Sequence, residues 1–367
     1  MRIVLLDSGT ARAERQEYLF ALAGLLQRQP DTEILFLCPR GSAFAERLKS
    51  ERFPFVPLPG SAWYNPFAVS ALRRELDAFG PTCVHAFGGA AARFAGRGLS
   101  RCNPASTRLV VSLPARPFAE PDTPLTRPEQ IPGPAARSAL AAVLCPSAWS
   151  ADALRKAGFP STLLHVVLPA LAPREDSKNP LPLHLPRRHW VFLTALPGRS
   201  TRGLSTLLEA MAYLRDRTDL PPWEMRILCT PDRFGSIRAK ARAKKLEERL
   251  CLLGGQNLSQ QLSLCDIAIT TDTACDEHHV FPLHVWRAAR PLICPATAPF
   301  LDIAGDERTA LFYKPGNAAA LASDMLRCMI DPNLYRRLRR LGLRRFASRT
   351  LDAVAWQILG IYQHIQC

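Results

Sequence analysis

The sequence lacks any apolar run long enough to cross a membrane. None reaches the roughly 18 to 20 consecutive apolar residues that a bilayer-spanning helix needs. The opening segment, MRIVLLDSGTARAER, has only a short apolar stretch, and no small-residue cleavage site follows a longer one. We therefore expect a first buried strand there instead of a signal peptide, and a cytoplasmic protein.

Paired cysteine motifs are also missing. The chain has 11 cysteines, but they are scattered and no C-x-x-C pair occurs, so neither a zinc-binding nor a disulfide pattern is present. Several of them, such as Cys38, Cys145, Cys229 and Cys294, lie in or beside apolar runs. This distribution indicates reduced thiols that act as small core residues in a reducing compartment.

The amounts of apolar and charged residues are those of a soluble globular protein. The 367 residues are 47% apolar and 22% charged, and the length suggests two domains. The formal net charge is +15, which favours anionic partners such as nucleotide phosphates, anionic lipid head groups or nucleic acid. The charge alone does not choose among them.

Short β-rich apolar runs alternate with helical patterns along the whole chain, which predicts an α/β fold with parallel sheets. The predicted strands of a first series are 2–8, 33–39, 53–59, 82–87, 107–114, 141–147 and 165–169. Those of a second series are 189–196, 225–229, 251–255, 266–272, 291–295 and 309–315.

The segment between the two series, APREDSKNPLPLHLPRR, is rich in proline and charge, as linkers are. We therefore predict a Rossmann-like domain over 1–172, a linker over 173–188 and a second Rossmann-like domain over 189–349. A helix over 350–367 is expected to pack back on the first domain. Residues 117–134 hold six prolines and are expected to form an extended surface loop.

Two loops that follow strands and open helices are candidates for phosphate binding. The first contains Gly9 but lacks the G-x-G-x-x-G spacing, so the local pattern favours an ordinary strand-to-helix turn over phosphate binding. The second, ALPGRSTRGLSTLLEAM over 195–211, carries Arg199 and Arg202. Two guanidinium groups where a strand ends suit a diphosphate, whereas the simpler alternative is two solvated arginines.

Acidic and imidazole side chains gather between residues 276 and 284. They are Asp276, Glu277, His278, His279 and His284. Their spacing matches no standard zinc motif, so recognition of sugar hydroxyls is the better interpretation and no metal is expected. His85 ends another apolar strand, where it is either a core histidine or a group that faces a cleft.

Two basic helical runs, 237–249 and 335–349, could contact nucleic acid or an anionic membrane, or could simply be solvated. Neither run accompanies a helix-turn-helix or an aromatic single-strand platform. Nucleic acid is therefore not an expected partner.

The order of these motifs resembles the family 4 glycosyltransferases over nearly the whole chain. GTARAERQEYLFALAGLLQR is similar to the family's opening helix and keeps Glu14 and Arg15. GPTCVHAF resembles its Asp-Val-Val-His-x-His strand, with His85 as the first histidine, and CPSAWSADALRKAG resembles its Pro-Ser segment. GRSTRGL is similar to its Gly-Arg…Lys-Gly loop, with Arg202 before Gly203, and Asp276 with His284 stand at the positions of its Glu-x7-Glu pair.

The resemblance implies a GT-B fold and a retaining glycosyltransferase that needs no cofactor and no obligatory metal. A nucleotide-sugar donor would bind the C-terminal domain, and an unknown acceptor, lipid-linked or a polysaccharide, would bind the N-terminal domain. The implied catalytic residues are His85, Asp276 and Glu277. The implied donor-binding residues are Gly9, Arg199, Arg202, Gly203 and His284.

Departures from the family pattern leave a second hypothesis open, a catalytically inactive GT-B protein that acts as a binding or scaffold subunit. Ala11 and Arg12 replace the paired glycines, Phe87 replaces the second histidine, and His284 replaces the second glutamate. In either case the basic helices are expected to allow peripheral contact with the inner face of an anionic membrane.

Overall fold

The structure is a computed structural model. It describes residues 1–7, 13–60, 65–100, 107–113, 138–172, 189–196, 203–271, 280–305 and 308–366, without the side chains of 13–17 and 366. The predicted linker over 173–188 and the proline-rich segment over 117–134 lie outside these residues. By its internal contacts the chain divides into two compact units, one of Met1–Ala172 with Thr350–Cys367 and one of Pro173–Arg349.

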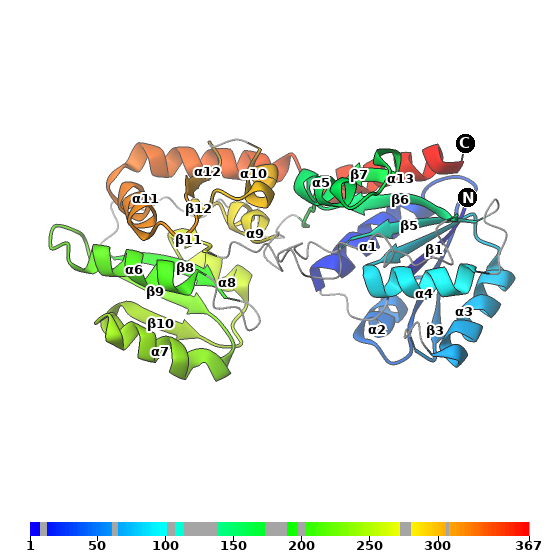
Figure 1. The fold of residues 1–367 in the computed structure, drawn as a ribbon, viewed down its shortest axis with the longest axis horizontal. Helices are drawn as coiled ribbons and strands as arrows, with labels where there is room; N and C mark the ends of the chain where they lie inside the picture. Colours follow the sequence, from blue (N-terminus) through cyan, green and yellow to red (C-terminus); the bar gives the residue numbers. More distant parts are fainter. Residues whose placement is uncertain are drawn as a thin grey trace. The chain divides into compact units, whose positions relative to one another are not determined.

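The first unit contains a parallel sheet of seven strands in the order β3-β2-β1-β4-β5-β6-β7 (Figure 1). Its strands are β1 (Arg2–Asp7), β2 (Glu33–Pro39), β3 (Phe55–Leu58), β4 (Cys83–Phe87), β5 (Arg108–Ser112), β6 (Leu140–Cys145) and β7 (Leu164–Val166). Its helices are α1 (Ala13–Gln27), α2 (Ala43–Ser50), α3 (Pro66–Phe79), α4 (Gly89–Leu99), α5 (Ala148–Lys156) and α13 (Leu351–Gln366).

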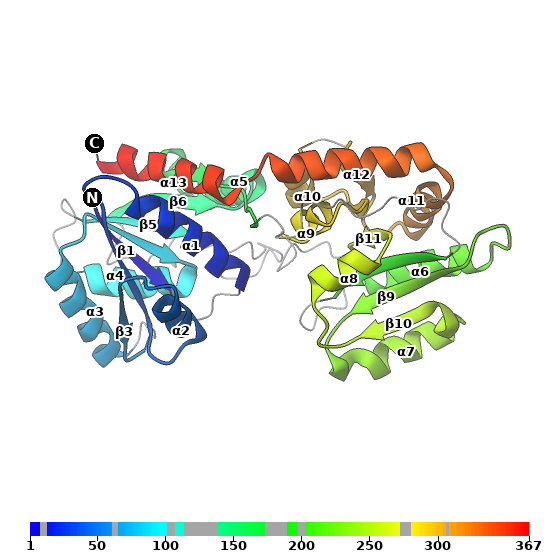
Figure 2. The same cartoon turned by 180° about the vertical axis from the view of Figure 1, so that it is seen from behind.

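Apolar side chains cover both faces of this sheet. One core cluster joins α1, α2 and α13 to one face, and a second joins α3, α4 and α5 to the other. Figure 2 shows the C-terminal helix α13, in red, beside α1, which it contacts extensively. The last helix of the sequence therefore completes the core of the first unit.

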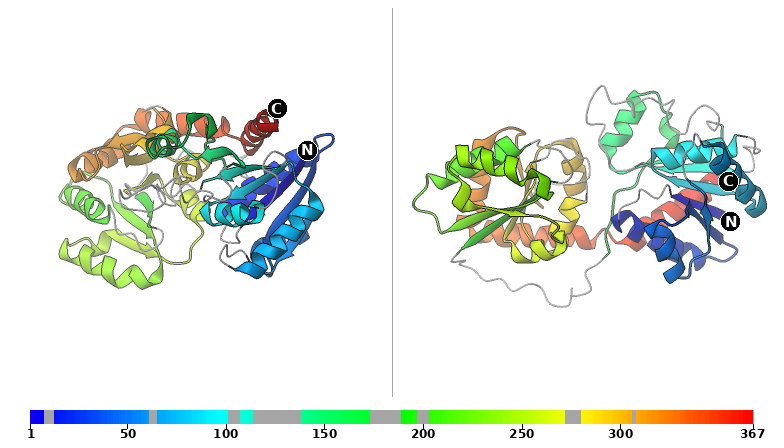
Figure 3. Two further views of the ribbon diagram at one scale, coloured as in Figure 1. Left: turned by 45° about the vertical axis from the view of Figure 1, so that its right-hand side comes forward. Right: turned by 90° about the horizontal axis from the view of Figure 1, so that it is seen from below.

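The second unit contains a parallel sheet of six strands in the order β10-β9-β8-β11-β12-β13, with helices on both faces (Figure 3). Its strands are β8 (Trp190–Ala195), β9 (Trp223–Leu228), β10 (Leu250–Leu253), β11 (Ile267–Ile269), β12 (Leu292–Pro295) and β13 (Leu311–Tyr313). Its helices are α6 (Leu204–Arg215), α7 (Phe234–Ala243), α8 (Leu258–Leu264), α9 (Phe281–Arg287), α10 (Ala298–Ala304), α11 (Ala318–Ile330) and α12 (Pro332–Ala347).

Two parallel α/β sheets confirm the predicted fold class of two Rossmann-like domains. Each predicted apolar run overlaps a strand, with ends that differ by a few residues. No helix in the described part of the chain is long and apolar enough to span a membrane.

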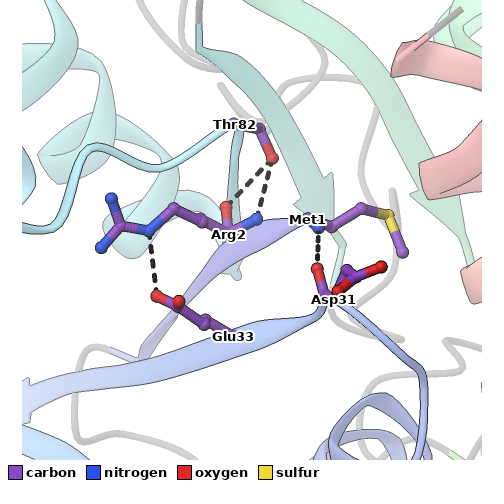
Figure 4. A network of polar contacts seen from close by, with 5 residues as sticks. All are labelled: Met1, Arg2, Asp31, Glu33 and Thr82. Carbon is purple, nitrogen blue, oxygen red and sulfur yellow. Dashed lines mark hydrogen bonds and ion pairs between the residues drawn. The ribbon is translucent and has the colours of Figure 1, made fainter.

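Polar contacts hold the amino edge of the first sheet together (Figure 4). Arg2 Nε donates to Glu33 Oε2 at 3.0 Å, which ties β1 to β2. The backbone N–H of Arg2 donates to Thr82 Oγ1 at 3.2 Å, and the N-terminal ammonium group donates to the carbonyl of Asp31. These contacts tie β1 to β2 and to the residue that precedes β4 at the amino edge of the sheet.

Candidate functional site at the carboxyl edge of the second sheet

The second sheet reverses its strand order between β8 and β11. Strand β8 pairs with β9 on one side and with β11 on the other. The strands that follow β8 in the sequence, β9 and β10, therefore lie on one side of it, and the later strands, β11 to β13, lie on the other. In open parallel sheets, ligands bind outside the carboxyl ends of the strands at such a point, because the loops on either side diverge there. The end of β8 and the end of β11 therefore form the candidate site.

Gly203 brings the start of α6 against the end of β11. It precedes α6 in a left-handed conformation, with φ at +75°, and no side chain caps the helix. A Cβ at this position would lie 2.0 Å from the backbone oxygen of Thr271. Only glycine fits at position 203, which was predicted from the sequence to bind the donor, and the close contact with Thr271 is the structural reason.

Buried hydroxyl groups line the same edge. Thr270 and Thr271 follow β11 and are 1% and 2% exposed. Their Oγ1 atoms are buried and have no hydrogen-bond partner within the described structure, whereas the Thr270 carbonyl accepts from Tyr313 Oη at 3.2 Å. A hydroxyl can both donate and accept, so these two groups suit a polar ligand.

Arg233 is a charged residue at this edge that was not predicted from the sequence. It lies in the turn Pro231–Arg233 after β9 and is 7% exposed. Its Nη1 donates to the carbonyl of Leu196 at 3.1 Å, directly before the segment that carries Arg199 and Arg202. The guanidinium group thus supports the chain at the end of β8 and adds positive charge there.

His284 lies in α9 and is 7% exposed. Its Nδ1 is 3.0 Å from Nη2 of Arg287, which also donates to Ser259 Oγ at 2.9 Å. Because a guanidinium group only donates, Nδ1 is the acceptor in this contact. The expected donor-binding role of His284 stays a prediction.

Five further candidates, Gly9, Arg199, Arg202, Asp276 and Glu277, lie outside the described residues. Their roles stay predictions. For the last four, the described neighbours fix where the segments begin and end: residues 197–202 join Leu196 to Gly203, and 272–279 join Thr271 to Val280, directly before α9. Both segments therefore leave from the same edge of the second sheet.

His85 lies in β4 and is fully buried. Its Nδ1 is hydrogen-bonded to the hydroxyl of Tyr362 in α13, and its Nε2 is 2.7 Å from Ser112 Oγ. Its ring stacks on Phe87 at 4.1 Å between centroids, and burial lowers its pKa to about 3. These contacts favour a core histidine. The ring could contact a sugar through a nitrogen only after its hydrogen bond to Ser112 or to Tyr362 had broken. Its catalytic role stays a prediction.

Two family models match the chain, one in each half. The model described as Glycosyltransferase Family 4 matches residues 16–174, and the model described as Glycosyl transferases group 1 matches residues 182–345. Together they cover most of the chain. No curated protein sequence matches it significantly.

Solved structures resemble the whole chain at low sequence identity. HepE from Anabaena, in complex with UDP, is 15% identical with a TM-score of 0.78 over 99% of this chain and 100% of that one. A glycosyltransferase from Rickettsia africae is 14% identical with the same TM-score, over 99% of this chain and 98% of that one.

The lipopolysaccharide outer core galactosyltransferase WaaB, in its apo form, is 12% identical with a TM-score of 0.71, over 99% of both chains. The two family models, the two parallel sheets and these neighbours agree. The chain belongs to the glycosyltransferases of GT-B fold, with a Glycosyltransferase Family 4 domain followed by a Glycosyl transferases group 1 domain.

Proposed function

We propose that the protein transfers a sugar from a nucleotide-sugar donor, and that the donor binds at the carboxyl edge of the second sheet. The observation that carries this proposal is the contact of Gly203 with Thr271, because it sets the start of α6 beside the end of β11 at the reversal of strand order. A helix start offers free N–H groups to a phosphate, and buried hydroxyls lie next to it.

A uridine diphosphate sugar is the first donor to test. The structural neighbour HepE is seen with UDP-glucose, and the chains share their fold. In the proposal Arg199 and Arg202 contact the diphosphate, where they stabilise the negative charge that develops on the leaving group. Asp276 or Glu277 holds hydroxyls of the sugar, and His284 contacts the donor.

The acceptor is proposed to be a lipid-linked saccharide or a polysaccharide of the cell envelope, bound by the first unit. The neighbour WaaB, which acts on lipopolysaccharide outer core, supports this class. Retention at the anomeric carbon is taken from the family resemblance. The eight described cysteines are free and seven of them are buried, which supports the proposed cytoplasmic location, at the inner face of the membrane.

The rival function is a binding or scaffold subunit without turnover. The observation in its favour is His85, because a residue whose two ring nitrogens are already hydrogen-bonded within the core presents neither to a substrate. A scaffold of this kind would keep the donor site and lose the reaction.

A turnover assay separates the two functions. Purified protein is incubated with UDP-, GDP- and ADP-sugars and a membrane saccharide extract, and free nucleotide is measured. The enzyme proposal expects nucleotide release that depends on one donor, with the product anomer matching the donor in proton NMR. Binding of a donor with no release under any condition would favour the scaffold.

A further inference from the structure

Helix α12 has one face made almost entirely of exposed arginines. Arg336, Arg337, Arg340 and Arg344 are all exposed, and no described residue forms an ion pair with any of them. Three of these, at positions 336, 340 and 344, follow the i, i+4 spacing and so lie above one another on the helix. Between Pro332 and Arg349 the sequence has no acidic residue at all.

The other two arginines of α12 form hydrogen bonds within the second unit. Arg339 Nε donates to the carbonyl of Ala289 at 2.8 Å, and Arg345 Nε donates to the carbonyl of Ile303 at 3.1 Å. Both bonds point inward to α9 and α10. These two arginines therefore have a structural role, whereas the exposed ones do not.

Packing fixes which face of α12 is turned outward. Leu334, Tyr335 and Leu338 belong to the core of the second unit. Gly342 lies against Trp286 so closely that a Cβ would be 2.3 Å from the indole Cδ1 atom. In Figures 1 and 2, α12 runs along the outer margin of its unit, with α9 and α10 on one side of it.

An apolar residue lies within the arginine face. Leu343 is 40% exposed and is three residues from Arg340 and seven from Arg336, so it shares their side of the helix. A helix that combines exposed arginines with an exposed leucine can place its cations on lipid phosphates while the leucine enters the head-group boundary.

The second basic helix, α7, lacks this arrangement. Arg238 lies over the ring of Phe234, Arg242 forms an ion pair with Glu247 at 2.8 Å, and Lys244 lies 3.9 Å from Glu209. Its cations are thus partly satisfied within the protein. Like charges stacked without partners, as on α12, repel one another, and this repulsion is relieved when an anionic surface binds.

We propose that the exposed face of α12, defined by Arg336, Arg337, Arg340, Leu343 and Arg344, docks the protein on an anionic phospholipid membrane. The inference rests on the proposed function for its purpose, which is to bring the donor-binding unit to a lipid-linked acceptor. The docking itself is independent of donor binding.

The test is co-sedimentation of the full-length protein with vesicles. One set contains phosphatidylcholine with about one third phosphatidylglycerol, and the other contains phosphatidylcholine alone. We expect binding to the first set only, and loss of binding as salt rises from about 0.1 M to about 1 M, where the screening length falls from about 10 Å to about 3 Å.

The triple variant Arg336→Glu, Arg340→Glu, Arg344→Glu should bind at least on the order of a hundredfold more weakly, because each basic residue near an anionic surface contributes about fivefold. The matched control, Arg238→Glu, Lys240→Glu, Arg242→Glu on α7, makes the same change in net charge and should bind nearly as the wild type does. If charge reversal prevents folding, the variant with glutamine at 336, 340 and 344 replaces it.

Equal loss in both triple variants would overturn the proposal, because total charge would then matter more than the α12 face. Binding to duplex nucleic acid without binding to anionic vesicles would also overturn it. A nucleotide titration of each variant accompanies the assay. If the wild type binds nucleotide but not anionic vesicles, the result counts against the α12 face alone. If it binds anionic vesicles but no nucleotide, the result counts against the proposed function alone.

Discussion

The backbone oxygen of Thr271 occupies the space beside Gly203 that any side chain would need. A Cβ there would lie 2.0 Å from that oxygen, and the positive φ of Gly203 adds strain for every other residue. This contact joins the start of α6 to the end of β11, beside the reversal of strand order in the second sheet. It therefore holds the geometry of the proposed donor site.

Gly203→Ala should destabilise the protein by at least about 2 kcal/mol, in the range that overpacking a tight contact costs. Chemical denaturation measures the change. Gly235→Ala is the matched control, since Gly235 lies in α7 with no atom within 4 Å of an added Cβ, and it should be neutral or slightly stabilising. Equal stability of the two variants would mean that the Gly203 contact is not as close as described.

His85 should make stability depend on pH. Its pKa is about 3 in the folded protein, against about 6.5 when unfolded, because burial disfavours the cation. Between these values the unfolded chain binds a proton that the folded protein does not, so stability falls as pH falls from about 6.5 toward 3.

Lowering the pH from 7 to 5 should therefore remove about 2 kcal/mol through His85 alone. The measurement compares the free energy of unfolding at both pH values in wild type and in His85→Gln. The wild type should lose about 2 kcal/mol more than the variant does. Identical pH dependence would show that the ring is not buried as a neutral group.

The regular elements were predictable because they depend on local pattern. Apolar runs such as 2–8 and 33–39 became β1 and β2, since buried parallel strands need continuous apolar residues. Helix α12 was likewise expected, as the basic helical run over 335–349. The placement of His85 was not, because its partner Tyr362 is 277 residues away in the sequence.

The candidate site was only partly predictable for the same reason. Gly203 was identified from its loop, but its contact with Thr271 requires the pairing of β8 with β11. Arg233 was missed because its importance depends on β9 lying beside β8. The partner of His284 was within reach, since Arg287 follows it by three residues on a helix and must share its face.

The acidic pair tests whether the protein turns over its donor. Asp276→Asn together with Glu277→Gln should lower sugar transfer or donor hydrolysis at least about a hundredfold, the scale of losing a contact made in the transition state. The measurement is initial rate at saturating donor. A rate within about threefold of wild type would remove both residues from the mechanism.

His284→Glu restores the residue that the family has at this position. We predict that it does not raise activity, because the neighbouring segment carries His278 and His279 and the ring already accepts a hydrogen bond from Arg287. A glutamate can accept the same bond, so the fold should tolerate the change. Activity that arises only in this variant would mean that the natural chain is an inactive descendant of an enzyme.

The central claim is that a nucleoside diphosphate binds at the carboxyl edge of the second sheet. Calorimetric titration of the purified protein with UDP, GDP and ADP tests it most directly. We predict one site for one of them, with a Kd between about 1 μM and 1 mM, and at least about tenfold weaker binding after Arg199→Ala with Arg202→Ala. No binding of any of the three nucleotides, or an affinity unchanged in the double variant, would contradict the account.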